Sequence, residues 1–439
     1  MSAPDVLPAW EPGEGAARAR ALFTEAFGGE AAGVWSAPGR VNVIGEHTDY
    51  NGGLALPIAL PHRTFLAVRP REDRTLRLVS SSAHGAAELD LDAVGPVGSP
   101  AEVTGWPAYV AGVAWAMEQP GGPAQRRRLP GADIAVVSCV PSGGGLSSSA
   151  ALECAAAIAW DEIAGLGLIR DAPDGAVSPA EVDAGRAVLA ALCVRAENEV
   201  AGAPTGGMDQ AASLRAHPGR ALLLDCRDGA IEHVPFDLAA ASLELLVIDT
   251  RAKHSHVDGG YGQRRATCEE AVGVLQVRDL REVADDVAAG ATLEAVLERL
   301  ETEEQRKRVR HVVTEIQRVR DLADLLRSGG LTAGGPAARA ALAEMAALLD
   351  DSHVSMRDDY EISCPELDLA VSAAQSAGAH GARMTGGGFG GSAIAVVDAA
   401  DAARVRAEIA RAFEDAGFAR PGFLPAVAAS PASRAEESD

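Results

Sequence analysis

The chain of 439 residues is short of positive charge. It has 39 lysine and arginine residues against 62 aspartate and glutamate residues, which gives a formal net charge of -23 at pH 7. Such an acidic surface repels phosphate backbones and anionic lipid headgroups, so neither nucleic acid nor a membrane is an expected partner. A nucleotide that binds here needs a local source of positive field, such as a metal ion, a helix N-terminus or selected arginines.

Cysteine is also scarce, and the six cysteines include no CxxC pair. This usage predicts reduced, mostly buried thiols in a cytoplasmic protein. Residues 1–14 are acidic and rich in proline, and they lack the basic segment and apolar core of a signal peptide. No apolar run reaches the roughly 18 residues that a membrane-spanning helix needs.

The length exceeds that of one ordinary hydrophobic core, so two domains are expected. We place the boundary loosely near residue 225, with 1–225 as the first domain and 226–430 as the second. Residues 431–439, which are mostly small or acidic, are expected to form a disordered tail. In the first domain, Trp106 and Tyr109 recur at helical spacing within 102–118 and are interpreted as core residues rather than ligand contacts.

The most distinctive stretch is a strand-like run that breaks into a polar loop. Residues 38–53 read Pro-Gly-Arg-Val-Asn-Val-Ile-Gly-Glu-His-Thr-Asp-Tyr-Asn-Gly-Gly. Alternating apolar residues predict the strand, and binding groups are commonly presented on the loop that follows one. Glu46, His47 and Asp49 can each exchange several hydrogen bonds, which suits a ligand covered in hydroxyl groups. The alternative is a solvated turn after an edge strand.

A second element is predicted to hold phosphate. An apolar strand at 132–140 leads into residues 141–150, which read Pro-Ser-Gly-Gly-Gly-Leu-Ser-Ser-Ser-Ala, and then into a long apolar helix. Glycines let the backbone approach a ligand, and the N–H groups at a helix N-terminus favour an anion. The loop is not a P-loop, because the sequence contains no GxxxxGK[ST]. A flexible loop with a serine N-cap is the alternative.

A third glycine-rich element spans residues 383–391, which read Arg-Met-Thr-Gly-Gly-Gly-Phe-Gly-Gly. It contains GxGxxG, but residues 392–397 predict a strand where the dinucleotide fingerprint requires a helix. The fingerprint is therefore rejected, and a hairpin that approaches the active cleft is expected.

Acidic and histidine residues supply further candidates. Glu197 and Asp209 flank a turn rich in glycine and proline, so one could hold a metal ion while the other lies beside a reacting hydroxyl. An ordinary helix end and a turn aspartate explain the pair equally well. His254, His256 and Asp258 have a metal-like spacing, but further ligands are lacking, so a ligand-facing loop is preferred to a zinc site.

Taken together, the three glycine-containing elements resemble those of the galactokinases, within the GHMP small-molecule kinase superfamily. The second and third elements belong to the whole superfamily, whereas Gly-Arg-Val-Asn-Val-Ile-Gly-Glu-His-Thr-Asp-Tyr is narrower and points to the galactokinase branch. The resemblance runs from about residue 35 to about residue 397. It implies an α+β fold of two lobes, with a ribosomal-S5-like N-terminal lobe, a ferredoxin-like C-terminal lobe and the active cleft between them.

The resemblance also implies an activity and its residues. The activity is transfer of the γ-phosphate of ATP, with Mg²⁺, to the C1 hydroxyl of α-D-galactose. Arg40 would lie beside the transferring phosphoryl group, and Asp209 would lie next to the C1 hydroxyl, where it either takes the proton or orients the hydroxyl. Ser149 and Glu197 would hold Mg²⁺. The sugar would contact Glu46, His47, Thr48, Asp49 and Tyr261. The nucleotide would contact Ser80 near its base, and Gly143, Gly144, Gly145, Leu146, Ser147, Ser148 and Ser149 around its phosphates.

Two departures and two alternatives accompany this resemblance. The family often has cysteine where Thr205 stands and an aliphatic residue where Gly207 stands, which loosens the register of the loop before Asp209. A silent galactose sensor on the same fold is disfavoured, because Ser149 and Asp209 are both intact. A kinase for a related sugar, such as N-acetylgalactosamine or arabinose, stays open. A monomer is expected.

Overall fold

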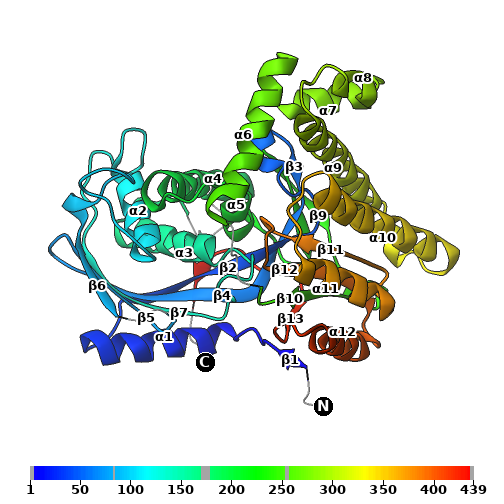
Figure 1. Ribbon diagram of the computed structural model, residues 1–439. Helices are drawn as coiled ribbons and strands as arrows, with labels where there is room; N and C mark the ends of the chain where they lie inside the picture. The colour runs from blue at the N-terminus through cyan, green and yellow to red at the C-terminus, as the bar shows by residue number, and fades with distance from the viewer. Residues whose placement is uncertain (1–3, 83–84, 170–177, 253–256, 436–439) are drawn as a thin grey trace.

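The computed structural model describes residues 4–82, 85–169, 178–252 and 257–435, with the side chains of 257–259 left aside. Figure 1 shows two lobes, one built mostly from the first half of the chain and the other mostly from the second. The chain thus forms the predicted two-lobed α+β fold.

A six-stranded mixed sheet forms the centre of the N-terminal lobe, in the order β14-β2-β4-β7-β5-β6. Its strands are β2 (Gly33–Asn42), β4 (Pro57–Pro70), β5 (Thr75–Ser80), β6 (Ala86–Asp90), β7 (Ala132–Ser138) and β14 (Ser433–Arg434). Every residue of β2 is buried, because helices cover both faces of the sheet. Alternate residues therefore pack in opposite directions: Val34 joins the core under α1 (Pro12–Phe27), whereas Trp35 joins the core under α3 (Ser148–Ile163).

Four further elements of this lobe carry or flank the site residues. They are α2 (Pro107–Glu118), α4 (Pro179–Ala196), a π-helical turn η3 (Glu197–Ala201) and α5 (Met208–Arg215). The 3-10 turn η1 (Asp49–Asn51) follows β2, and η2 (Leu91–Ala93) follows β6. A small three-stranded sheet, in the order β3-β8-β9, consists of β3 (Leu54–Ala55), β8 (Arg220–Asp225) and β9 (Ala230–Pro235).

The C-terminal lobe contains a five-stranded sheet in the order β1-β13-β10-β12-β11. Its strands are β1 (Asp5–Val6), β10 (Leu243–Asp249), β11 (Gly381–Thr385), β12 (Ser392–Asp398) and β13 (Gly422–Ala426). The helices of the second half are α6 (Val257–Leu275), α7 (Leu280–Ala288), α8 (Leu293–Leu297), α9 (Glu303–Arg327), α10 (Gly335–Asp358), α11 (Pro365–Ser376) and α12 (Ala402–Ala416), with 3-10 turns η4 (Ala239–Ala241) and η5 (Gly330–Thr332). Strands β11 and β12 pair as the predicted antiparallel hairpin. Within the described residues, no helix is both long and apolar enough to cross a membrane.

The first strand of the chain lies in the sheet of the C-terminal lobe, and the last strand lies in the sheet of the N-terminal lobe. Near the N-terminus, β1 pairs with β13, and near the C-terminus, β14 pairs with β2. The expectation of a disordered tail from residue 431 is therefore wrong for the described residues 431–435. The buried guanidinium of Arg63 holds this segment, because it donates to the carbonyl oxygens of Ser430 and Pro431 at 2.9 Å each. The domain boundary near residue 225 stays a prediction, although the paired strands β8 and β9 lie on either side of it.

Candidate active site

Three motifs that lie far apart in the sequence meet at one place. Arg40 Nη1 donates to the carbonyl oxygen of Gly145 at 2.7 Å, which joins the first motif to the second. The amide of Gly386 donates to Glu46 Oε1 at 2.7 Å, which joins the third motif to the first. A Cβ at Gly386 would lie 2.9 Å from the Gly145 carbonyl oxygen, so the second and third motifs also touch.

The predicted phosphate loop folds into the N-terminus of α3. Gly143, Gly145 and Ser147 all have positive φ, and Ser147 precedes the first helical residue, Ser148. The loop is held from the C-terminal lobe, because Ser392 Oγ donates to the Gly144 carbonyl oxygen at 2.6 Å. The first-turn amides of α3, which have no partners within the helix, can therefore donate to an anion held in this loop.

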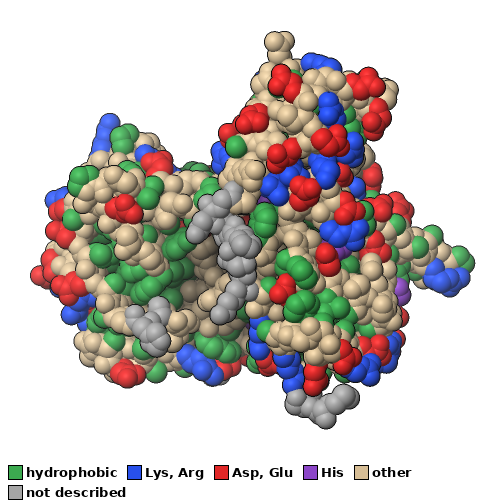
Figure 2. Space-filling view, viewed as in Figure 1, with side chains coloured by type: hydrophobic (Ala, Val, Ile, Leu, Met, Phe, Trp, Pro, Cys, Tyr) green, Lys and Arg blue, Asp and Glu red, His purple; other side chains and the backbone are tan. Residues whose placement is uncertain are grey.

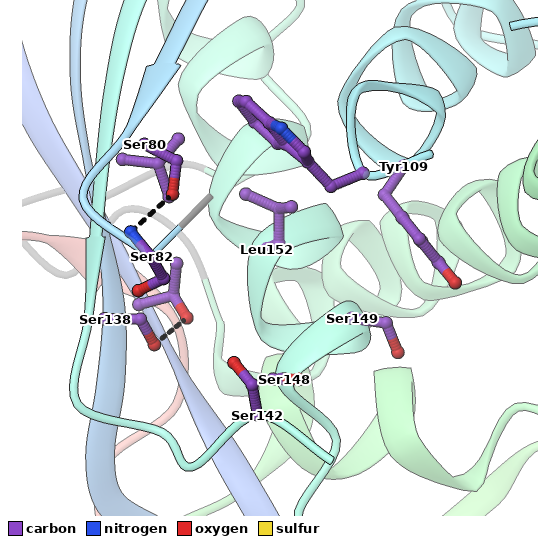
Figure 3. A pocket seen from close by; sticks show the side chains of 11 residues that line it. Ser80, Ser82, Tyr109, Ser138, Ser142, Ser148, Ser149 and Leu152 are labelled. Atoms are coloured by element: carbon purple, nitrogen blue, oxygen red, sulfur yellow. Dashed lines mark hydrogen bonds between the residues drawn. The ribbon is translucent and has the colours of Figure 1, made fainter. Parts of the chain in front are cut away.

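A cavity of about 260 Å³ opens beside this helix terminus. Figure 2 shows the N-terminal lobe hollowed at a place where hydrophobic side chains gather. Figure 3 shows Ser142 and Ser148 at one end of the cavity and Ser80 farther along it, with Leu152 between. The lining residues are Thr64, Ser80, Ser82, Trp106, Tyr109, Val136, Ser138, Ser142, Ser148, Ser149 and Leu152. The structure thus brings Ser80 together with the serines of the phosphate loop.

Trp106 and Tyr109 serve both the core and this cavity. They are partly buried and pack against the core of the N-terminal lobe, as expected, but both also line the cavity. Their neighbours Val110, Val113 and Met117 are fully buried in the core, as expected. Trp106 and Tyr109 lie at the N-terminal end of α2, and their rings offer flat apolar surface to a ligand in the cavity.

Arg40 of β2 and Asp209 of α5 form a close ion pair beside the phosphate loop. Arg40 Nε lies 2.8 Å and Nη2 2.7 Å from Asp209 Oδ1. The other carboxylate oxygen accepts a hydrogen bond from Ser147 Oγ at 2.5 Å. The Arg40 side chain is 6% exposed and the Asp209 side chain 22% exposed, so the carboxylate is still accessible to a ligand.

Ser149 and Glu197 also come together. The Ser149 hydroxyl lies near enough to the Glu197 carboxylate to lower its pKa, but burial and then the charge of Asp209 outweigh this effect and raise the pKa of Glu197 to about 7. Gln210 Nε2 donates to Glu197 Oε2 at 2.5 Å and to Glu153 Oε2 at 3.1 Å. Glu153 was missed in the sequence, although it is the one charged residue within 150–160.

The donor set at this place fits a magnesium ion. A hydroxyl and a carboxylate are hard oxygen ligands, and Mg²⁺ is commonly bound by one or two protein oxygens together with substrate phosphates. Gln210 Oε1 and Glu153 Oε1 are buried without hydrogen-bond partners among the described residues. The surroundings therefore offer oxygen atoms that a cation could use.

Asp49 lies against the loop that leads to Asp209. A Cβ at Gly206 would lie 2.2 Å from Asp49 Oδ2, so only glycine permits this approach. Burial, followed by the charge of Asp209, raises the pKa of Asp49 to about 6. Gly207, with φ near 100°, directly precedes α5 in a conformation that an aliphatic residue rarely adopts.

His47 belongs to a hydrogen-bonded aromatic cluster. Its Nδ1 lies 2.7 Å from the Tyr50 hydroxyl, which lies 2.8 Å from the Tyr360 hydroxyl. Its Nε2 lies 3.2 Å from the carbonyl oxygen of Gly387. Burial lowers the pKa of His47 to about 3, so the ring is neutral at pH 7. Tyr261 completes the cluster, with its ring centroid 5.1 Å from that of His47.

Glu46 and Thr48 are both buried in the loop after β2, and their expected place in the sugar site stays a prediction. Glu46 is buried, and its oxygens accept hydrogen bonds from Asn42, Thr385 and Gly386 and pair with Arg383 at 3.2 Å. Thr48 is fully buried, and its hydroxyl lies 2.9 and 2.7 Å from the carbonyl oxygens of Gly45 and Leu54. Both side chains hold the loop in shape. His254 and His256 lie outside the described residues, as does the side chain of Asp258.

Comparisons with known proteins agree with this geometry. Three family models match the chain: a galactokinase galactose-binding signature over 21–70, the GHMP kinases N terminal domain over 108–217 and the GHMP kinases C terminal model over 336–415. Galactokinase from Streptomyces coelicolor is 47% identical, over 94% of this chain and 96% of its own length. Galactokinase from Mycobacterium tuberculosis is 42% identical, over 90% and 97%.

Solved structures of kinases are also similar to this chain. Lactococcus lactis galactokinase, crystallised with galactose, superposes with a TM-score of 0.79 at 29% identity, over 94% of this chain and 98% of that one. Methanococcus jannaschii mevalonate kinase shares the fold, with a TM-score of 0.57 at 15% identity over 92% and 99%.

Proposed function

Because the chain belongs to the galactokinase family, we propose that it transfers the γ-phosphate of ATP to the C1 hydroxyl of α-D-galactose, giving galactose 1-phosphate and ADP. One observation supports this reaction above all. The Arg40–Asp209 ion pair lies where the phosphate loop meets the polar loop after β2. A sugar hydroxyl and a γ-phosphate brought to this place have a carboxylate and a guanidinium beside them.

The chemistry asks for positioning and charge neutralisation more than for covalent help. Asp209 accepts the hydrogen bond of the attacking hydroxyl and orients its oxygen toward phosphorus. Arg40 and Ser147 hold that carboxylate from both sides, and the Arg40 charge also stabilises the transferring phosphoryl group. The amides at the N-terminus of α3 donate to the phosphates, and the cavity of Ser80 and Trp106 takes the base.

Magnesium belongs to the proposal as a companion of ATP. Ser149 and Glu197 would hold it, because they are the hydroxyl and carboxylate that meet beside the phosphate loop. When bound, the ion neutralises charge on the β- and γ-phosphates.

His47, Asp49 and Tyr261 bind the sugar in this account. The Asp49 carboxylate accepts hydrogen bonds from sugar hydroxyls, while the rings of His47 and Tyr261 supply an apolar wall with polar edges. Glu46 and Thr48 act behind them by holding the loop. We also place the enzyme in the cytoplasm as a monomer, and its six unpaired cysteines accord with a reducing compartment.

The test is ADP release from MgATP with galactose, talose, 2-deoxygalactose, glucose, arabinose and N-acetylgalactosamine side by side. We expect fast turnover with galactose and little with glucose or N-acetylgalactosamine. Galactose binding without turnover would instead indicate a sensor. Turnover only with another sugar would keep the kinase and reject the assigned substrate.

A further inference from the structure

Gln210 joins three elements around the phosphate end of the nucleotide cavity. Its Nε2 donates to Glu197 Oε2 at 2.5 Å and to Glu153 Oε2 at 3.1 Å. Glu197 begins the π-helical turn after α4, Glu153 lies one turn after Ser149 in α3, and Gln210 follows Asp209 in α5. Gln210, Glu153 and Glu197 are each more than nine-tenths buried.

The orientation of the amide follows from its neighbours. An amide nitrogen carries two hydrogens and can serve two acceptors, here one oxygen of each carboxylate. When both acids are ionised, the reversed orientation would turn the amide oxygen toward two carboxylates, an arrangement without a donor. Gln210 Oε1 consequently has no partner among the described residues. The bridge holds two buried acids close together, which would otherwise repel each other.

We propose that Gln210 is a positioning residue, which Glu153 anchors from α3 and which holds the Glu197 carboxylate in place for the metal–nucleotide complex. The inference rests on the proposed function, because it takes Glu197 as a ligand of Mg²⁺. Gln210 itself acts through Glu197, so its loss affects the part of nucleotide affinity that depends on the metal. Galactose affinity, and nucleotide affinity without metal, are expected to stay as they are.

Calorimetric titration of the full chain with ADP, in Mg²⁺ and in EDTA, tests this directly. Gln210→Met keeps the length of the side chain and removes the donor. In this variant, we expect the tightening of ADP binding by Mg²⁺ to be about tenfold smaller than in the wild type, the factor expected for one hydrogen bond to a charged group. ADP affinity in EDTA and galactose affinity should equal those of the wild type. A merely structural role would weaken all three affinities together.

Two sets of controls make the test specific. Ser213→Ala removes another buried hydrogen bond of α5, from Ser213 Oγ to the Pro38 carbonyl oxygen, and should leave the Mg²⁺ effect intact. Glu153→Gln keeps an acceptor for the amide, whereas Glu153→Leu removes it. The first should behave as the wild type and the second as Gln210→Met, so this pair carries the test if Gln210→Met folds poorly.

The outcomes separate this inference from the proposed function. A wild-type Mg²⁺ effect in Gln210→Met, or equal losses of all three affinities, would overturn the inference alone. If the wild type phosphorylates galactose but binds ADP equally with and without Mg²⁺, the assignment of Glu197 fails and the inference fails with it. If the wild type shows the Mg²⁺ effect but no galactose phosphorylation, only the proposed reaction is rejected.

Discussion

Arg40 contacts a single oxygen of Asp209 through two of its nitrogens, at 2.8 Å from Nε and 2.7 Å from Nη2. Ser147 occupies the second oxygen, so the carboxylate is held in one orientation from two elements. Removal of either partner would leave the other charge without its counter-ion in a largely buried place, which is costly. The pair is the part of the site on which the proposed chemistry depends most.

Trp106 should contribute to ATP binding and not to sugar binding. It lines the cavity together with Ser80, away from the Asp49 and His47 cluster. Trp106→Ala removes a large apolar surface, so KM for ATP should rise about tenfold or more, the factor for a loss of roughly 1.5 kcal/mol. Initial rates at varied ATP and varied galactose measure both constants, and an unchanged KM for ATP would contradict the placement of the base. Trp115→Ala, which alters a tryptophan of α2 that does not line the cavity, is the matched control.

Asp49 should cost the enzyme stability at neutral pH. Its pKa is raised from 3.8 to about 6, so the folded state binds the proton more tightly than the unfolded state does. Asp49 therefore stabilises the folded state fully below about pH 4, and this contribution is lost as pH rises through about 6. The free energy of unfolding should fall by about 3 kcal/mol over that range. Asp49→Asn removes the titration and keeps an acceptor for the Tyr50 amide.

Thermal unfolding at pH 4 and pH 8 measures this contribution. Relative to the wild type, Asp49→Asn should be stabilised at pH 8 and should gain nothing at pH 4. Its galactose affinity should fall at both values. A variant less stable than the wild type at pH 8 would show that the ionised carboxylate has a partner that compensates for its burial.

The C-terminal segment should stabilise the lobe that it crosses. Truncation after residue 428 removes the carbonyl oxygens of Ser430 and Pro431 from the buried Arg63 guanidinium, together with strand β14. Leaving this cation short of two acceptors should lower the free energy of unfolding by roughly 3 kcal/mol. Chemical denaturation measures the loss, and truncation after residue 435 is the control that should change nothing. If the two truncated forms were equally stable, the segment would not stabilise the lobe, and the prediction would be wrong.

Much of the site could be predicted because its motifs combine local chemistry with local structure. The strand, glycine loop and helix at 132–163 are neighbours in the chain, so their order was enough to indicate phosphate binding. The strand after the third glycine element likewise predicted the hairpin. The chain has three asparagines, and the side-chain amide of each donates a hydrogen bond within or beside a site loop. Asn42 donates to Glu46, Asn51 to the His47 carbonyl oxygen and Asn198 to the Thr205 carbonyl oxygen.

The features that the sequence did not predict all depend on contacts between segments that are distant in the chain. Trp106 and Val110 share a helical spacing, and only the position of α3 decides that one faces a cavity and the other the core. The segment 431–435 is ordered because β2 offers it an edge, about 400 residues earlier in the chain.

The central claim is that Asp209 carries phosphoryl transfer from within its pair with Arg40. The most direct test is Asp209→Asn, with galactose affinity measured by calorimetry and turnover measured by ADP release. Asparagine keeps the size of the side chain but loses the negative charge, so the variant should bind galactose nearly as the wild type does and lose most of its turnover, about a thousandfold. Turnover equal to that of the wild type would contradict the account, because Asp209 would then have no part in the reaction.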